Sequence, residues 1–191
     1  MPVPLPWTDL EGPCATSPFW ENAAAELKKH KAHLIVTASP VDENPVAGAR
    51  LLTKAIAAVL QATSAIGVYC GAGTLVHSSE TFLEHAAEMS EECLPLYLWV
   101  DFRVMADEGD TVTLFTTGME ALGFREMEIV QSQIEPAELV DLVFNFAHYL
   151  LDNGPVLADG DTIGMSETQE ITIRHVPSIF EERGNVCRLE L

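Results

Sequence analysis

The stretch LYLWVDFRVM, from Leu96 to Met105, shows the clearest strand pattern in the chain. Its side chains alternate between two sets, as they do in a strand that turns one face toward a hydrophobic core. Strands buried on both faces usually read as continuous hydrophobic runs, so the alternation favours an antiparallel sheet over a parallel one. One set is Leu96, Leu98, Val100, Phe102 and Val104, and the other is Tyr97, Trp99, Asp101, Arg103 and Met105.

One long helix and several strands are expected after this stretch. The helix starts at Pro136, which suits a first helical turn, and stops at Asn153-Gly154-Pro155, because a glycine followed by a proline ends a helix. Its expected inward row is Leu139, Leu142, Val143, Phe146 and Leu150. The expected strands are Thr111–Thr117, Arg125–Gln131, Glu170–Val176 and Val186–Leu191.

Ahead of the stretch, helices and strands alternate. Residues Pro2–Pro18 hold five of the eleven prolines, which predicts an extended arm that stays out of any sheet interior. The elements expected next are a helix over Trp20–Lys31, a strand over His33–Ala38, a helix from Pro45, a strand over Ala65–Cys70 and a short helix capped by Ser78 or Ser79.

This order of elements predicts an α+β fold with a mixed, largely antiparallel sheet and helices packed on it. Ferredoxin-like βαβ and ββα units produce such an order. The alternative is an α/β doubly wound sheet. With 191 residues, 48% of them hydrophobic, the chain is long enough for one core without disulfides or metals. We therefore expect a proline-rich extended arm over residues 1–18 and a single α+β domain over residues 19–191.

Charge is the strongest deviation in composition. The formal net charge is −19; residues 1–54 carry five basic against six acidic residues, and residues 55–191 carry five against 23. This balance excludes nucleic acid and anionic membranes as partners, because both are bound mainly by lysine and arginine. It favours either simple solubility or a surface for a basic protein partner. The chain shows no bilayer-spanning run and no basic signal start, so we expect a cytoplasmic protein.

Metal and cofactor signatures do not occur in the sequence. The four cysteines form no CxxC pair, which indicates reduced thiols rather than a zinc ribbon. The histidines form no i, i+4 pair, so we predict neither a metal site nor a cofactor. A convergence of His77, His148 or His175 with Asp159 and Asp161 is left open.

A ligand-binding face is predicted on the stretch Leu96–Met105. Trp99, Asp101 and Arg103 share one side of the expected strand, where an ion pair beside an aromatic wall could orient a carboxylate or a planar ligand. The structural alternative is that Asp101 and Arg103 pair with each other and with cross-strand neighbours. The full set of candidate ligand-binding residues is Trp99, Asp101, Arg103, His77, His148 and Asp161.

A stripe of glutamates is the candidate partner-binding surface. Glu80, Glu84 and Glu88 recur at every fourth position of the expected short helix, with no lysine or arginine among them. Like charges at this spacing cost a helix about 0.2–0.5 kcal/mol per pair, which packing can offset. Solvation alone explains such a stripe, and a docking edge for a basic partner is the other interpretation.

Five segments, spread over most of the chain, form a distinctive set: HKAHLIVTAS (His30–Ser39), GVYCGAGTLVHS (Gly67–Ser78), LPLYLWVDFRV (Leu94–Val104), LFTTGMEALGF (Leu114–Phe124) and AHYLLDNGPVLADGDTIG (Ala147–Gly164). Together they resemble the bacterial family called domain of unknown function 4261, over most of the chain. The family has no established activity, cofactor or catalytic residues to carry over. The resemblance also implies that similar proteins have a leading strand and helix before the equivalent of Val3.

Two functional hypotheses follow. The first is a non-enzymatic interaction protein whose acidic surface binds a basic partner, in the manner of an inhibitor or immunity protein. The second is a small-molecule binder or hydrolase that uses the face of Trp99, Asp101 and Arg103 with a nearby histidine. No GxSxG or HExxH motif occurs, so the sequence does not decide whether the protein is an enzyme. Self-association through a sheet edge is compatible with both hypotheses.

Overall fold

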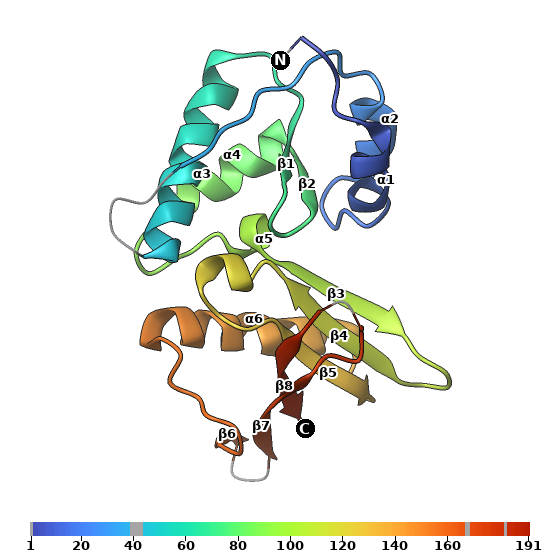
Figure 1. The fold of residues 1–191 in the computed structure, drawn as a ribbon, viewed down its shortest axis with the longest axis vertical. Helices are drawn as coiled ribbons and strands as arrows, with labels where there is room; N and C mark the ends of the chain where they lie inside the picture. Colours follow the sequence, from blue (N-terminus) through green and yellow to red (C-terminus); the bar gives the residue numbers. More distant parts are fainter. Residues whose placement is uncertain (1, 39–43, 167–168, 182) are drawn as a thin grey trace. The chain divides into compact units, whose positions relative to one another are not determined.

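The computed structural model describes residues 2–38, 44–166, 169–181 and 183–191. The chain divides into two compact units, Met1–Val100 (unit 1) and Asp101–Leu191 (unit 2) (Figure 1). The predicted domain boundaries stay a prediction.

Unit 1 combines five helices and a small hairpin among its described residues. Strands β1 and β2 pair antiparallel, from Gly67 opposite Ser78 to Cys70 opposite Leu75. The side chain of Ser78 accepts a hydrogen bond from the backbone N–H of Thr81, so the predicted cap of α4 is confirmed. The elements are α1 (Trp7–Ala15), α2 (Ala23–Leu27), α3 (Pro45–Ala62), β1 (Gly67–Cys70), β2 (Leu75–Ser78), α4 (Ser79–Glu88) and α5 (Leu96–Trp99).

The prediction of an extended arm over residues 1–18 is wrong for Trp7–Ala15, which forms helix α1. Leu10 and Cys14 stand four residues apart, on one side of α1, and both are buried. They pack with Trp20 of the following loop, Leu27 of α2 and Val76 of β2 in one hydrophobic cluster. Because a packed face can outweigh the loss of one helical hydrogen bond, α1 accommodates Pro13 in its interior.

Two further predictions for unit 1 are wrong. The helix expected over Trp20–Lys31 is limited to α2, and His33–Ala38 forms neither helix nor strand. Leu34 and Ile35 remain 64% and 71% exposed, and no strand of the described residues pairs with this segment.

The stretch Leu96–Met105 is a strand only in its second half. Leu96–Trp99 forms one helical turn, α5, and β3 begins at Asp101. Leu96, Leu98 and Trp99 are all buried. A single helical turn buries this run on several sides, whereas a strand would have placed Trp99 opposite Leu96 and Leu98. The alternating pattern was therefore produced by two different structures in succession.

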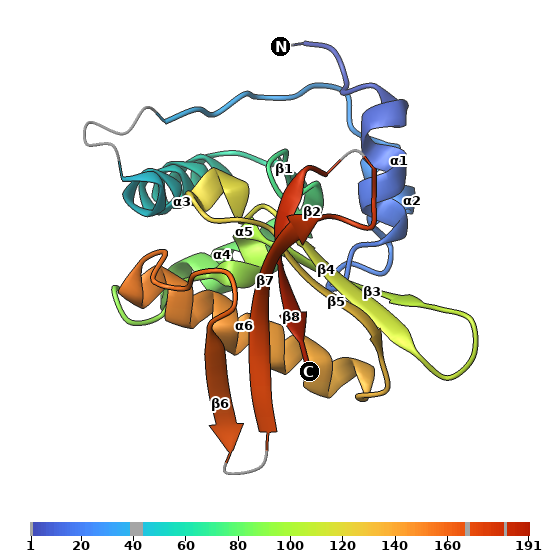
Figure 2. The ribbon, with the colours of Figure 1, turned by 60° about the horizontal axis from the view of Figure 1, so that its bottom comes forward.

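In its described residues, unit 2 is a six-stranded sheet with one long helix (Figure 2). The strand order is β3-β4-β5-β8-β7-β6, and all neighbouring pairs are antiparallel except β5 with β8. The predicted α+β class and mixed, mostly antiparallel sheet are confirmed. The elements are β3 (Asp101–Ala106), β4 (Val112–Thr117), the 3-10 turn η1 (Glu120–Leu122), β5 (Met127–Ser132), α6 (Pro136–Asn153), β6 (Thr162–Ser166), β7 (Gln169–Pro177) and β8 (Asn185–Glu190).

Helix α6 connects β5 to the rest of the sheet and packs against β3 and β4. It has the predicted bounds, and Gly154 ends it with a φ of 81°, a left-handed value that glycine adopts without strain. The rings of Phe102 on β3 and Phe144 on α6 lie 5.7 Å apart. Asp101 and Arg103 flank Phe102 in the strand, so they project from the opposite face of the sheet.

Candidate functional site

The strands β5 and β8 meet at one end and separate at the other. Met127 pairs with Cys187 and Glu128 with Arg188, and no further pair joins these strands within the described residues. Both views show the strands diverging toward their C-terminal ends (Figures 1 and 2). The divergence leaves a cleft of about 670 Å³, lined by residues 129–134 and 188–191. We call it the β5–β8 cleft.

A β-bulge lies where β5 leaves β8. Leu114 pairs with Ile129 but Val112 pairs with Ser132, so β5 contains one extra residue over this interval. Gln131 in the bulge has a φ of 52°, which is strained for a residue with a side chain. Its backbone N–H donates to Thr113 Oγ1 at 3.2 Å. A bulge bends its strand, and this one bends β5 at the wall of the cleft.

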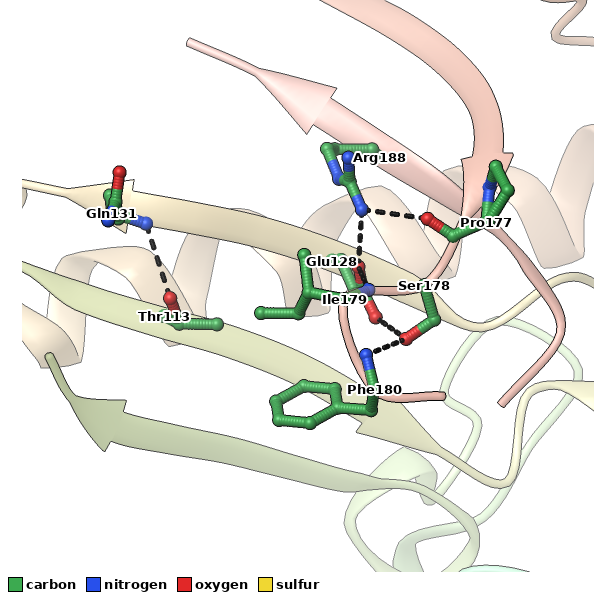
Figure 3. Close-up of polar contacts among 8 residues, drawn as sticks. All are labelled: Thr113, Glu128, Gln131, Pro177, Ser178, Ile179, Phe180 and Arg188. Carbon is green, nitrogen blue, oxygen red and sulfur yellow. Dashed lines mark hydrogen bonds and ion pairs between the residues drawn. The ribbon is translucent and has the colours of Figure 1, made fainter. Parts of the chain in front are cut away.

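A buried carboxylate holds the closed end of the cleft (Figure 3). Glu128 is fully buried and accepts from Arg188 Nη2 at 3.0 Å, from the backbone N–H of Ile179 at 3.4 Å and from Ser178 Oγ. Arg188 Nη2 also donates to the carbonyl of Pro177 at 3.0 Å. These contacts tie β5, β8 and the segment after β7 together, so the cleft has a fixed base.

A row of polar and aromatic side chains continues from this base across the sheet. Arg103, Phe115, Glu128 and Arg188 are register partners on β3, β4, β5 and β8, and they share the face opposite α6. The guanidinium of Arg183 stacks 4.2 Å from the Phe115 ring centre. It also donates to the carbonyl of Thr116 at 2.7 Å and to Thr117 Oγ1 at 2.6 Å. The cations of this face are thus engaged with groups of unit 2 itself.

Within unit 2, the sequence-derived ligand residues do not gather in one place. Asp101 and Arg103 form an ion pair with each other, as the structural alternative expected. Burial raises the pKa of Asp101, and Arg103 opposes that effect. His148 on α6 packs 4.9 Å from the ring of Phe144, on the helix side of the sheet. Asp161 stands before β6 at the other edge of the sheet, where Oδ2 accepts from the backbone N–H of Ala158.

In unit 1, two candidate residues are internal. Trp99 belongs to α5 rather than to a strand, and its Nε1 donates to Thr53 Oγ1 on α3 at 2.9 Å. His77 on β2 is 1% exposed, and neither ring nitrogen has a hydrogen-bond partner within the described structure. Burial lowers the pKa of His77 to about 4, against a smaller opposing contribution from the Leu98 backbone. Both side chains are therefore packed away from ligands in solution.

The predicted glutamate stripe is on the surface. Glu80, Glu84 and Glu88 are all exposed on α4. Arg50 of α3 is 3.7 Å from the exposed carboxylate of Glu91, just beyond the stripe. The exposure agrees with both interpretations of the stripe, and its role as a docking edge stays a prediction.

The described residues contain neither a metal-ligand cluster nor a membrane-spanning helix. No group of three or more His, Cys, Asp or Glu side chains in that part of the chain is placed to hold a metal ion. In the same part of the chain, no helix has both the length and the apolar character needed to cross a bilayer.

The region from within β4 to the end of β8, which contains all of the cleft lining except Leu191, matches a known protein family. Residues 115–190 match the family described as Domain of unknown function (DUF4261). This confirms the resemblance to that family, over residues 115–190 rather than over most of the chain. The DUF4261 match covers both walls of the cleft, Glu128 and Arg188. No curated protein and no solved structure matches the chain.

Sequence reasoning missed the residues of the cleft. Glu128 is the one charged residue in the run Met127–Val130. Arg188 is likewise the one charged residue in the run Val186–Leu189. One acidic and one basic residue, each inside a short apolar strand, signal a buried pair between neighbouring strands. That pattern makes β8 one candidate neighbour of β5.

Proposed function

We propose that unit 2 is a non-enzymatic binding module that takes an extended segment of a basic partner protein into the β5–β8 cleft. The observation that carries the proposal is the separation of β5 and β8 after two pairs of residues. Backbone groups that face such a gap do not pair across it, and an added strand can bond to them. The same type of crevice, beyond the carboxyl ends of neighbouring parallel strands, is a common place for ligands in open sheets.

The charge of unit 2 supports a basic partner. The unit contains 18 acidic and five basic residues, a formal net charge of −13. Four of its five arginines contact groups of the unit: Arg103 with Asp101, Arg174 with Glu190, Arg188 with Glu128, and Arg183 with Phe115. The surface therefore keeps a large excess of carboxylates. Such a field raises the rate at which a positively charged partner arrives and excludes acidic ones.

The walls of the cleft suit a segment of alternating character. Val130 and Ile134 are half-buried, and Leu191 is exposed at the end of β8, which gives apolar contacts. Glu190 lines the same cleft and offers an exposed carboxylate. Successive side chains of an extended peptide point in opposite directions, so a segment of alternating aliphatic and basic residues meets both kinds of group.

The proposal fits inhibitor-like and immunity-like roles, in which an acidic protein masks a basic one. It does not use the glutamate stripe of α4, which stays a separate candidate surface. The competing idea of a small-molecule site around Trp99, Asp101 and Arg103 has less support. The Trp99 indole bonds to Thr53, and the charges of Asp101 and Arg103 are paired with each other.

Binding of a designed peptide tests the proposal. The probe is a short capped peptide of alternating lysine and valine, titrated into the ¹⁵N-labelled full chain at low salt. We expect amide shifts at residues 129–134 and 188–191, and binding that weakens as salt is added. A matched peptide of glutamate and valine should produce no shifts.

Charge reversal within the cleft provides the control. Glu190→Lys should weaken binding of the lysine–valine peptide by about tenfold or more, since close charge pairs at interfaces couple by about 1.5 kcal/mol or more. Glu138→Lys makes the same charge change on the exposed face of α6, outside the cleft lining. Equal losses in both variants, or shifts confined to α4, would show that the acidic surface and not the cleft binds the peptide.

A further inference from the structure

Segment 33–38 of unit 1 has the composition of a strand and the exposure of a loop. Its sequence is HLIVTA, yet Leu34 and Ile35 are 64% and 71% exposed. β-branched and aliphatic residues of this kind are normally covered in a sheet. The segment starts from a fixed point, because His30 Nε2 accepts from the backbone N–H of Leu5 at 2.7 Å and His33 Nδ1 lies 2.9 Å from the carbonyl of Val3.

A wide apolar groove lies beside this segment. Its volume is about 1210 Å³, and it is lined by residues 33–36, helix α3 and strand β1, and also by Leu10 of α1, Leu27 of α2 and residues 29–32, all within unit 1. Leu34, Ile35 and Val36 form one wall. Facing residues of the groove include Ile56, Val59 and Leu60 of α3 and Gly67, Val68 and Tyr69 of β1.

Helix α3 is under-packed on the side of the groove. It has 18 residues and a clear apolar stripe, but only Thr53 and Leu60 are buried. Helix α6 has the same length and buries six residues against its sheet. Ile56 and Val59 of α3 line the groove and are only half-buried. The apolar stripe of α3 therefore has room for one more layer of side chains.

Strand β1 has an edge on this groove. It pairs with β2 on one side, and no other described strand pairs with it. A two-stranded hairpin is marginal by itself, and a third strand gives a stable sheet. The chain runs from segment 33–38 through α3 to β1, an order that places two strands parallel with a helix covering them.

We infer that the groove is a strand-binding site and that its occupant is the chain's own segment 33–38. In the closed form the segment pairs parallel to β1, covers the stripe of α3 and gives a three-stranded sheet. Its anchored start at His30 and His33 lets it move without unfolding α2. This inference concerns unit 1 and does not depend on the function proposed for unit 2.

Amide exchange and cross-strand contacts test the inference. In the ¹⁵N-labelled full chain, closure predicts amides of residues 34–37 that exchange at least about 100-fold more slowly than in an open segment. It also predicts contacts between amide protons of residues 33–38 and of residues 67–70. Exchange at the open-chain rate in a folded protein would overturn the inference.

Two controls separate the other outcomes. A mixture of labelled and unlabelled chains shows whether the contacts join two molecules, in which case a second copy fills the groove and the inference is wrong. Ile35→Asp should speed exchange at Val68 and Tyr69 by about tenfold or more, because a charge in the groove opposes closure. Leu51→Asp places the same charge at an exposed leucine of α3 outside the groove lining, and it should leave those rates unchanged. Equal effects of both changes would contradict closure.

Discussion

Arg188 and Glu128 face each other at the point where the two halves of the sheet join. Arg188 Nη2 lies 3.0 Å from Glu128 Oε2, and the residues are register partners on the parallel strands β8 and β5. Glu128 is fully buried, whereas 22% of the Arg188 side chain is exposed. The joint between β3-β4-β5 and β8-β7-β6 thus contains a charge pair at the base of the cleft. Removing one partner of such a pair leaves an uncompensated buried charge.

The first prediction concerns this pair. Arg188→Met should lower the free energy of unfolding of unit 2 by about 3 kcal/mol or more, because Glu128 stays buried without its cation. Arg174→Met removes the cation of an exposed pair with Glu190, whose side chains are 44% and 53% exposed. That change should cost at most about 1 kcal/mol. Urea denaturation followed by far-UV circular dichroism compares the two, and equal losses would contradict the role given to Glu128.

The second prediction concerns the bulge. Gln131→Gly should raise the stability of unit 2 by about 1 kcal/mol, because glycine adopts the observed φ of 52° without strain. Gln131→Val should lower it, since a β-branched residue is disfavoured there. Gln133→Gly is the matched control outside the positive-φ positions, and glycine there should bring no gain. A stabilising effect of Gln133→Gly alone would show that the bulge is not strained.

The third prediction concerns the buried indole of unit 1. Thr53→Val keeps the shape of the side chain but removes the acceptor for Trp99 Nε1. The unpaired buried donor should cost about 1–3 kcal/mol. Thr53→Ser retains the hydroxyl and should recover part of the loss. Trp7, Trp20 and Trp99 are the three tryptophans, and all lie in unit 1, so fluorescence-detected denaturation follows that unit directly.

Local signals predicted several elements of the fold. Pro136 lies in the first turn of α6 and Gly154 follows its last residue. The conformational preferences of these two residues operate without tertiary contacts, and the bounds of the helix were predicted from them. The alternation of Leu96–Met105 gave a wrong prediction for Leu96–Trp99, because burial around Trp99 selected a helical turn instead of a strand. Strand β2 was missed because its turn includes Thr74 at a φ of 53°, which propensity alone does not anticipate.

The site was less accessible to sequence reasoning than the fold. Glu128 and Arg188 are 60 residues apart, and no spacing rule joins them. Trp99, Asp101 and Arg103 do not form the single strand face that was predicted. Trp99 lies in α5, and the boundary between the two compact units falls between Trp99 and Asp101. Asp101 and Arg103 were correctly seen to share a face, since they stand two residues apart on β3. Pairing between distant strands is decided by packing, which a single sequence shows only weakly.

The fourth prediction is an acid sensitivity of unit 1 that comes from His77. Burial lowers the pKa of its imidazole to about 4, below the ordinary value of 6.5. The folded state therefore excludes a proton that the unfolded chain accepts. The resulting stability is fully present above about pH 6.5 and is lost as the pH falls toward 4. The loss should be on the order of 3 kcal/mol, measured by urea denaturation with tryptophan fluorescence across this range.

Removal of the imidazole isolates this effect from other titrations. His77→Leu keeps an apolar contact with Phe82, whose ring centre lies 6.3 Å from that of His77, and removes two unpartnered nitrogens. The stability of this variant should change little between pH 6.5 and 4. His85→Leu removes a half-buried histidine of α4 whose charge makes a small contribution to the low pKa of His77, and this variant should retain most of the slope. If the slope persists in His77→Leu and disappears in His85→Leu, the proton is taken up at α4 and the buried imidazole of β2 is not the acid-sensitive group.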